Sequence, residues 1–212
     1  MKYLTMTSPS YAPLTDHMIK TSGVRFDEWE IMHEPQRSSG NFGESWFNEI
    51  CCKRPARILE LLREGHDVFV VDGDVTFFDP ITEIEIHPKA SVQAQIDPDS
   101  GLCCGAILYK SNYRVIEFME VVLQNCIASG SAHNDQVITN AVLQQFPQVR
   151  PRLAAFNTIH SFATLVEPRL WMGDDFDIPT DCQAFHANFA IGIDNKIKLL
   201  QYARMQWTKN RN

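Results

Sequence analysis

The sequence predicts a single α/β domain over residues 1–212, with a mostly parallel central sheet flanked by helices. Apolar segments of strand length alternate with segments of helical periodicity through most of the chain, without an internal repeat or a low-complexity linker. The 212 residues are enough for one substantial hydrophobic core and few for two. A hydrophobic content of 44% and a charged content of 21% are those of an ordinary globular domain.

The N-terminal part of the chain is predicted to form a strand, a helix and a second strand. Apolar residues favour a strand at 2–7, and a polar loop follows Thr7. The helix is expected at 14–22, the second strand at 24–32 and a turn-rich loop at 33–43. In a parallel sheet, the loop after the first strand reaches the carboxyl edge, which is a common ligand site.

Two helices, at 44–52 and 55–64, are expected to lead to the central strand. The second has an apolar face, and Gly65 after it suits a helix stop. Lys53, Arg54 and Arg57 cluster near its start, either as a solvated face or as ligands of an anion. Residues 67–71 form a strand buried on both faces, because β-branched and aromatic residues follow one another without alternation.

The second half of the chain is predicted to add four strands and three helices. The strands are expected at 91–96, 102–109, 151–158 and 183–186, and the helices at 113–128, 137–146 and 194–207. Gly105 lies inside one of these strands, where a glycine often marks close approach by a ligand or another backbone. Asn134 or Asp135 would cap the helix at 137–146. Residues 159–181 are expected to be irregular, because proline and glycine recur in them.

Two carboxylates directly follow the central strand. Asp72 and Asp74 stand at i and i+2, so an extended backbone directs both side chains to one side. Gly73 between them lets a ligand approach the backbone. Two acids at the end of a buried strand repel each other and lose hydration, which is unfavourable unless a cation or a proton resolves it. The pair is therefore either a metal site or a plain polar exit from the strand.

The bulk charge and the cysteines bound the protein's surroundings. A net charge of −7 argues against nucleic acid as the main partner. The N-terminus has no signal-like apolar region, and no segment approaches the ~20 apolar residues of a membrane span. The six cysteines include no Cys-x-x-Cys, which favours reduced thiols and a cytoplasmic protein.

One function hypothesis for the two acids is phosphoryl transfer. Residues 72–76, Asp-Gly-Asp-Val-Thr, match the first motif of haloacid-dehalogenase-type phosphatases, in which Asp72 would be the nucleophile. Residues 173–177 could supply the late acidic motif of that class. Two features count against this hypothesis: residues 166–172 make a poor strand before the late motif, and a strand and helices precede the first motif. Another hypothesis is that the protein is a non-catalytic module that binds a sugar nucleotide.

Four segments in order make the chain resemble the metal-dependent nucleotide-sugar glycosyltransferases of the GT-A fold. They are the Asp-x-Asp at 72–74, the small residues at 103–108, Asn-Asp-Gln at 134–136, and His186-Ala187-Asn188 followed by Gly192 and Lys196. The spacing of the last segment departs from the family-8 pattern and fits the family-77 type of nucleotide-diphospho-sugar transferase better. The chain also looks like the small glycosyltransferase domains of large algal viruses.

This resemblance implies a set of site residues. The metal, Mn²⁺ or Mg²⁺, would be held by Asp72, Asp74 and His186. The base and ribose of the donor would contact Thr5, Thr7 and Tyr11, and Asp72 could also bind the ribose; the charge of the diphosphate would be offset by Lys196 and, more weakly, by Arg57. The strand that contains Gly105 would pack on the donor sugar, and Asp135 with Gln136 would lie at the reacting centre. Read without the resemblance, His186 could be a core histidine, Lys196 a surface lysine and Asp135 a helix cap.

The resemblance also implies the reaction. The protein would transfer a sugar from a nucleotide diphosphate donor, UDP-linked by preference, to a glycan or another hydroxyl acceptor. The family-77 likeness implies retention of configuration, with Asp135 orienting the acceptor or stabilising a cationic sugar; in an inverting enzyme Asp135 would be the general base. We expect a monomer in the cytoplasm, or in the host cytoplasm if the protein is viral.

Overall fold

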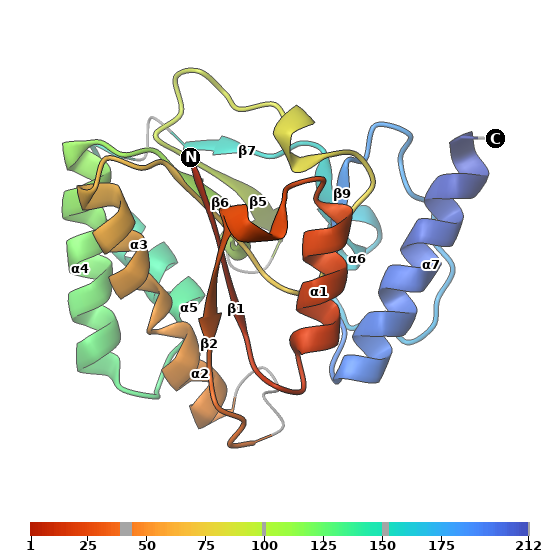
Figure 1. Ribbon diagram of the computed structural model, residues 1–212, viewed down its shortest axis with the longest axis horizontal. Coiled ribbons are helices and arrows are strands. Elements are labelled where there is room, and N and C mark those ends of the chain that lie inside the picture. The colour runs from red at the N-terminus through yellow and green to blue at the C-terminus, as the bar shows by residue number, and fades with distance from the viewer. Residues whose placement is uncertain (39–43, 99–100, 150–152, 212) are drawn as a thin grey trace.

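A six-stranded sheet forms the centre of the protein in the computed structural model, which describes residues 1–38, 44–98, 101–149 and 153–211 (Figure 1). Its strands are β1 (Lys2–Thr7), β2 (Trp29–His33), β3 (Val68–Val71), β5 (Val92–Asp97), β6 (Gly101–Tyr109) and β7 (Leu153–Ala155). They lie in the order β2-β1-β3-β6-β5-β7. Among the described residues, β1 pairs in parallel with β2 and β3, and β5 with β7, whereas β6 runs antiparallel to β3 and β5. The mixed α/β architecture with a mostly parallel sheet is thus confirmed.

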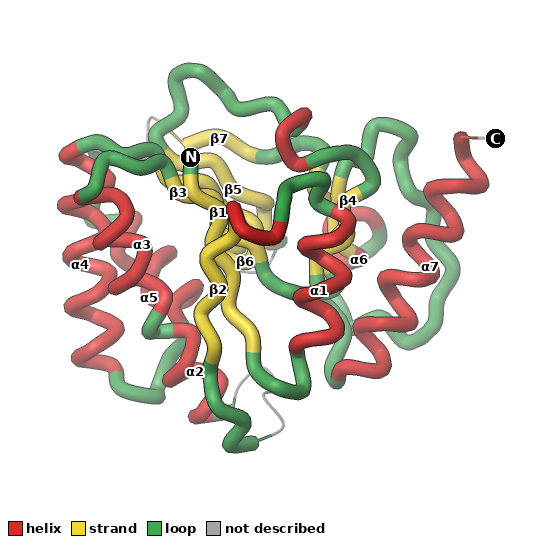
Figure 2. The backbone as a smooth tube through the Cα atoms, viewed as in Figure 1, coloured by secondary structure: helices red, strands yellow, loops and turns green. Residues whose placement is uncertain are grey.

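A smaller sheet and seven helices complete the described part of the fold. The smaller sheet has the order β4-β9-β8 and consists of β4 (Val75–Phe77), β8 (Ile159–Ser161) and β9 (Ala184–His186). The helices are α1 (Ala12–Thr21), α2 (Ser45–Cys51), α3 (Arg54–Arg63), α4 (Tyr113–Ser129), α5 (Asp135–Leu143), α6 (Phe162–Leu165) and α7 (Ile193–Arg211), with 3₁₀ turns at Phe26–Glu28 and Ile81–Glu83. Helices α2 to α5 gather on one side of the central sheet, and α1 and α7 lie on the other (Figure 2).

The central strand β3 is buried on both faces, as its uninterrupted apolar sequence predicts. Val68 and Val70 belong to the core formed with α3, α4 and α5, whereas Phe69 and Val71 belong to the core on the side of α1. All four side chains are at most 1% exposed. Because both faces are covered, polar groups on this strand can reach solvent or a ligand only at its end, where Asp72 begins.

Strand direction brings the ends of several strands to one edge of the sheet. Strands β1, β3 and β5 point the same way, because β1 pairs in parallel with β3 while β6 runs antiparallel to both β3 and β5. Their carboxyl ends therefore meet the amino end of β6 at a single edge. This edge receives Thr7 from β1, Asp72 after β3 and Asp97 at the end of β5.

Several predicted elements need correction. The strand expected at 24–32 begins only at Trp29, because a 3₁₀ turn occupies residues 26–28. Strands β4 and β8 and helix α6 were not predicted, since three or four residues are too few to show a period. The final helix runs to Arg211, beyond the expected end. Parts of the predicted loop 33–43 and of the predicted strand 151–158, namely residues 39–43 and 151–152, lie outside the described residues.

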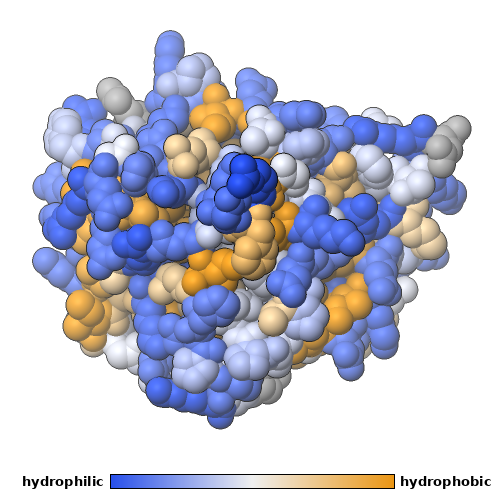
Figure 3. Space-filling model, viewed as in Figure 1, coloured by the Kyte–Doolittle hydropathy of each residue, from blue (hydrophilic) through white to orange (hydrophobic). Residues whose placement is uncertain are grey.

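The surface agrees with the ordinary hydropathy of the sequence. On the face shown in Figure 3, hydrophilic residues cover most of the area and hydrophobic residues are scattered among them. Within the part of the chain that the structure describes, no helix combines the length and the apolar character needed to cross a membrane.

Candidate active site

Three potential metal ligands converge at the end of the central strand. Asp72 and Asp74 follow β3, and His186 is the last residue of β9. The pairing of β4 with β9 places Val75 opposite His186, and the Ala187 amide donates a hydrogen bond to the Asp74 carbonyl at 3.0 Å. The small sheet therefore carries the histidine to the two acids across more than a hundred residues of chain.

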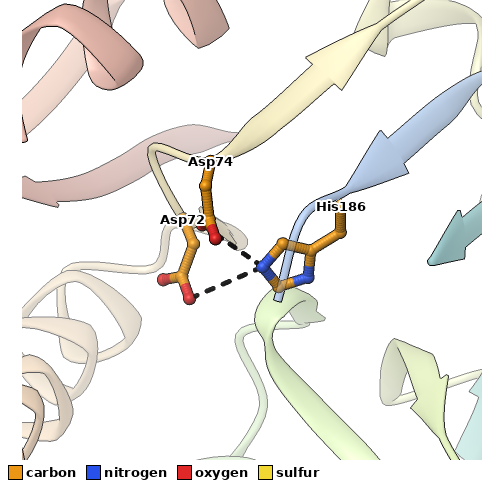
Figure 4. A group of neighbouring side chains, drawn as sticks. All are labelled: Asp72, Asp74 and His186. Carbon is orange, nitrogen blue, oxygen red and sulfur yellow. Dashed lines mark ion pairs between the residues drawn. The ribbon is translucent and has the colours of Figure 1, made fainter. Parts of the chain in front are cut away.

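The three side chains point toward one another in Figure 4. His186 Nε2 lies 3.3 Å from Asp74 Oδ1 and 3.9 Å from Asp72 Oδ2. One ligand atom from each of the three residues lies within 4.8 Å of the other two. The side chains of Asp74 and His186 are each 2% exposed, whereas that of Asp72 is 34% exposed. Asp72 therefore forms the open side of the cluster.

The surroundings of the cluster fit a divalent cation. His186 Nδ1 donates to Gln95 Oε1 at 2.9 Å, so loss of the proton from Nε2 would turn the lone pair of that nitrogen toward the acids. A Cβ on Gly105 would lie 2.6 Å from Asp72 Oδ2 and would also meet the His186 ring, so only glycine leaves both ligands in place. Two carboxylates and an imidazole suit Mn²⁺, and the carboxylates also suit Mg²⁺.

Lys196 and His186 balance the charge of the buried acid. Lys196 Nζ forms an ion pair with Asp74 Oδ2 and lies 5.9 Å from the centre of the Tyr11 ring. Burial alone would raise the pKa of Asp74, but the Lys196 ammonium and His186 hold it below its ordinary value. Burial alone would lower the pKa of His186, but the Asp74 carboxylate raises it to about 10. Lys196 and His186, which were both predicted as site residues, therefore lie beside the same carboxylate, that of Asp74.

Arg54 connects this cluster to Asp135. Its Nε lies 2.9 Å from Asp135 Oδ2 and its Nη2 3.0 Å from Asp135 Oδ1, while Nη1 pairs with Asp72. Burial raises the pKa of the Asp135 carboxyl, and the Arg54 guanidinium opposes part of that rise. Asp135 is only 4% exposed, and Asn134 caps α5 by accepting from the Val137 amide at 3.0 Å. The acid is thus free of the capping role and faces Arg54.

Arg57, the predicted phosphate ligand, lies elsewhere. It pairs with Glu30 and Glu60 and is not among the described residues that line the two cavities of the site. Arg54 takes the inward position instead. Helical spacing alone did not separate the two arginines, because Arg54 stands four residues before the buried Ile58 and Arg57 four residues before the buried Leu61.

Gln136 is held at both ends of its amide. The Cys104 amide donates to its Oε1 at 3.0 Å, and its Nε2 donates to Asp97 Oδ2 at 3.1 Å. Asp97 is 8% exposed and was not a predicted site residue. It could have been found as the last residue of a strand that runs parallel to β3, had the strand directions been known.

A cavity of about 300 Å³ joins these groups, a size within the range of small-molecule sites. A smaller cavity of about 60 Å³ lies beside it and shares Tyr11, Phe47, Cys51, Arg54 and Asp72 with it. The other residues of the larger cavity are Asp74, Asp97, Cys103, Asn134, Asp135, Gln136, Val137, Leu170, His186, Asn188, Phe189, Ala190, Ile191, Gly192, Ile193 and Lys196.

The remaining predicted residues lie at different depths. Thr7 lines the smaller cavity, whereas Thr5 is fully buried and lines neither. Gly73 also lines the smaller cavity, but a Cβ there would strike Thr15 of α1. Residue 73 must therefore be glycine because it packs closely on α1, a reason that the sequence-based prediction did not include.

A family model described as nucleotide-diphospho-sugar transferase matches residues 17–200. The chain belongs to this family. The matched range contains the acid pair, Arg54, Asp135, His186 and Lys196, and it includes all the described residues that line the larger cavity except Tyr11. The protein is therefore a glycosyltransferase, as the sequence resemblance implied.

Solved structures of glycosyltransferases share the fold of this nucleotide-diphospho-sugar transferase. One is a glycosyltransferase involved in the glycosylation of the major capsid of PBCV-1, with 12% identity, a TM-score of 0.55, and coverage of 88% of this chain and 93% of that one. Another is GlyE of Streptococcus pneumoniae TIGR4, with 14% identity, a TM-score of 0.55, and coverage of 98% of this chain and 61% of that one. No curated protein matches the chain.

The family assignment replaces the haloacid-dehalogenase hypothesis. In a haloacid-dehalogenase-type phosphatase, the late acidic motif would place Asp174 or Asp175 beside Asp72. In the transferase, Asp174 instead pairs with Arg169, and both side chains are more than a third exposed. Neither acid of this segment is among the described residues lining the two cavities.

Proposed function

We propose that the protein transfers a sugar, with retention, from a UDP-linked donor to a hydroxyl acceptor, and that the reaction depends on a divalent metal ion. The observation that carries this proposal is the cluster of Asp72, Asp74 and His186 in a cavity of about 300 Å³ that also contains Lys196 and Asp135. Cation ligands, a phosphate-binding cation and a buried carboxylate thus line one space of ligand size.

The smaller cavity suits the nucleoside end of the donor. Tyr11, Trp46 and Phe47 give it aromatic walls, and Thr7 and Ser8 contribute hydroxyl groups. Aromatic faces stack on a nucleobase, and hydroxyl groups can hydrogen-bond to its edge or to the ribose. Since the two cavities share a wall at Asp72, a nucleotide there would direct its diphosphate toward the cluster.

The diphosphate would lie between the acid cluster and the start of α7. Asp72, Asp74 and His186 would hold Mn²⁺ or Mg²⁺, which would offset the charge that develops on the departing diphosphate. Lys196 would exchange its pair with Asp74 for a phosphate oxygen. The cavity is also lined by Gly192 and Ile193, where α7 begins and offers the positive end of its helix dipole.

Asp135 is the carboxylate we assign to the reacting centre. The bidentate contact with Arg54 fixes its orientation, and the same arginine links it to Asp72. In a retaining transfer the carboxylate would stabilise positive charge on the sugar or orient the acceptor hydroxyl. Gln136 and Asp97 form the adjoining wall and can hydrogen-bond to sugar hydroxyls.

A panel of thermal unfolding measurements tests the proposal. UDP, GDP and their sugars are added with Mn²⁺ or with a chelator, and the unfolding temperature is recorded. We expect UDP to stabilise the protein in Mn²⁺ but not in chelator. Asp74→Asn should abolish this response, and Asp27→Asn, at a surface aspartate that pairs with Arg25, should retain it. Equal stabilisation by UDP in chelator would overturn the metal assignment.

Product analysis separates an enzyme from a module that only binds the sugar nucleotide. A transferase should release UDP from its donor, slowly by hydrolysis and faster with an acceptor, and the product anomer reports retention. Tight binding of the donor with no UDP released under any condition would instead support a non-catalytic module.

A further inference from the structure

Part of the lining of the large cavity consists of exposed aliphatic side chains. Val137, Leu170 and Ile191 line this cavity but not the smaller one, and they are 44%, 41% and 49% exposed. They come from the first turn of α5, from the segment after α6 and from the segment before α7. Separate parts of the chain thus contribute exposed aliphatic side chains to the lining of one cavity.

This apolar rim, defined by Val137, Leu170 and Ile191, borders the reacting centre. Val137 and Asp135 both belong to the first turn of α5 and both line the large cavity, so the rim shares one space with the carboxylate assigned to the sugar. Asp72 and the other residues that line both cavities lie on the side of the large cavity that adjoins the smaller one. A donor bound where the two cavities meet would leave the apolar rim uncovered, so the acceptor could contact the rim.

The charge of the cavity restricts that second substrate. Four carboxylates line the described cavity, those of Asp72, Asp74, Asp97 and Asp135. The lysine and arginine side chains among its described lining residues, Lys196 and Arg54, already pair with these acids. A phosphorylated or carboxylated acceptor would find no uncommitted cation among the described residues of the rim, whereas a neutral one meets no such penalty.

We propose, on the basis of the proposed function, that the acceptor is a neutral hydroxyl compound with an aliphatic group next to its polar part, of the alkyl glycoside kind. The polar part would lie against Asp97, Asp135 and Gln136, and the aliphatic group against the apolar rim. The rim is aliphatic at all three positions, which favours an alkyl chain over a bare sugar ring. Covering exposed aliphatic surface stabilises such a complex without a charged contact.

Saturation-transfer NMR with the whole protein tests the proposal without turnover. The probes are n-hexyl β-glucopyranoside, below its micelle concentration, and methyl β-glucopyranoside, with and without UDP and Mn²⁺. We expect the hexyl compound to bind on the order of tenfold more tightly, since several methylene groups leave water. The double variant Leu170→Ser, Ile191→Ser should reduce this ratio about fivefold. Ile127→Ser, at a 74% exposed position on α4 that does not line the cavity, is the matched control and should keep the wild-type ratio.

The outcomes separate the acceptor class from the proposed function. A hexyl-to-methyl ratio near one in the wild type, or a ratio unchanged in the double variant, would overturn the proposed acceptor class while UDP binding could still stand. Failure of UDP to bind in the unfolding panel would overturn the proposed function on which this inference rests. Hexyl binding that depends on Leu170 and Ile191 supports the rim in either case.

Discussion

The substitution Gly105→Ala probes the proposed metal cluster without removing any of its ligand atoms. The added Cβ would lie 2.6 Å from Asp72 Oδ2 and against the His186 ring, a separation that folded proteins do not tolerate. Because β6 is buried between its neighbours, Asp72 and His186 must move to make room. The perturbation therefore falls on two of the three ligands at once.

The expected magnitude has two parts. Overpacking costs about 1–3 kcal/mol of folding stability, which lowers the unfolding temperature by about 2–12 °C for a chain of this length. Mn²⁺ at a hundred times its dissociation constant should stabilise the wild type by about 2.7 kcal/mol, or about 5–11 °C. If the displaced ligands weaken metal affinity about a hundredfold, the same Mn²⁺ concentration gives only about 0.4 kcal/mol, or 1–2 °C.

The assay is thermal unfolding with and without Mn²⁺, and the metal-induced shift is the quantity compared. Ala106→Ser is the matched control, since Ala106 is the next residue of β6 and packs on the opposite face, in the core beside Val71. It should lower the unfolding temperature equally with and without metal. If Gly105→Ala keeps the full wild-type shift, the cluster is not the metal site.

Three further substitutions test the cations and the central carboxylate. Arg54→Met should lower the free energy of unfolding in urea by about 3–5 kcal/mol, because it leaves the buried Asp135 without its cation and removes one partner of Asp72; a loss under about 1 kcal/mol would contradict this. Asp135→Asn should reduce kcat for sugar transfer by about 100-fold or more at unchanged UDP affinity, since it removes only the charge; a loss below tenfold in steady-state assays would exclude the assigned role. Lys196→Met should weaken UDP binding in calorimetry about 10- to 100-fold, the worth of one charged hydrogen bond, whereas Lys198→Met, at an exposed neighbour, should not.

Local patterns in the sequence were sufficient for most of the fold. An uninterrupted run of β-branched and aromatic residues predicts a strand buried on both faces wherever it occurs, and β3 has that burial. The helical periodicity of α4 and the breaker residues around α3 likewise act within a few residues. The alternation of such segments predicted the α/β class, because covering both faces of a sheet needs helices between the strands.

Strands β4 and β8, helix α6 and the pairing of distant strands left no such pattern, although the strand at 183–186 was predicted. Strands β4 and β9 have three residues each, and their pairing joins residues 75–77 to residues 184–186. Nothing within either segment specifies the other, because strand pairing is decided by packing and by backbone hydrogen bonds made across the chain. His186 entered the predicted metal site through a family resemblance and not through its own surroundings.

By itself, the sequence determined that two acids would stand at the end of a buried strand, since this needs only the apolar run and the position of Asp72 and Asp74. The tertiary structure decided what meets them. Pairing across the small sheet brings His186 to within 3.3 Å of Asp74, and the rotation of α3 turns Arg54 inward and Arg57 outward. The relative directions of side chains along one element follow from local geometry. The cations that stabilise a buried carboxylate come from segments that are distant in sequence, so only the tertiary structure identifies them.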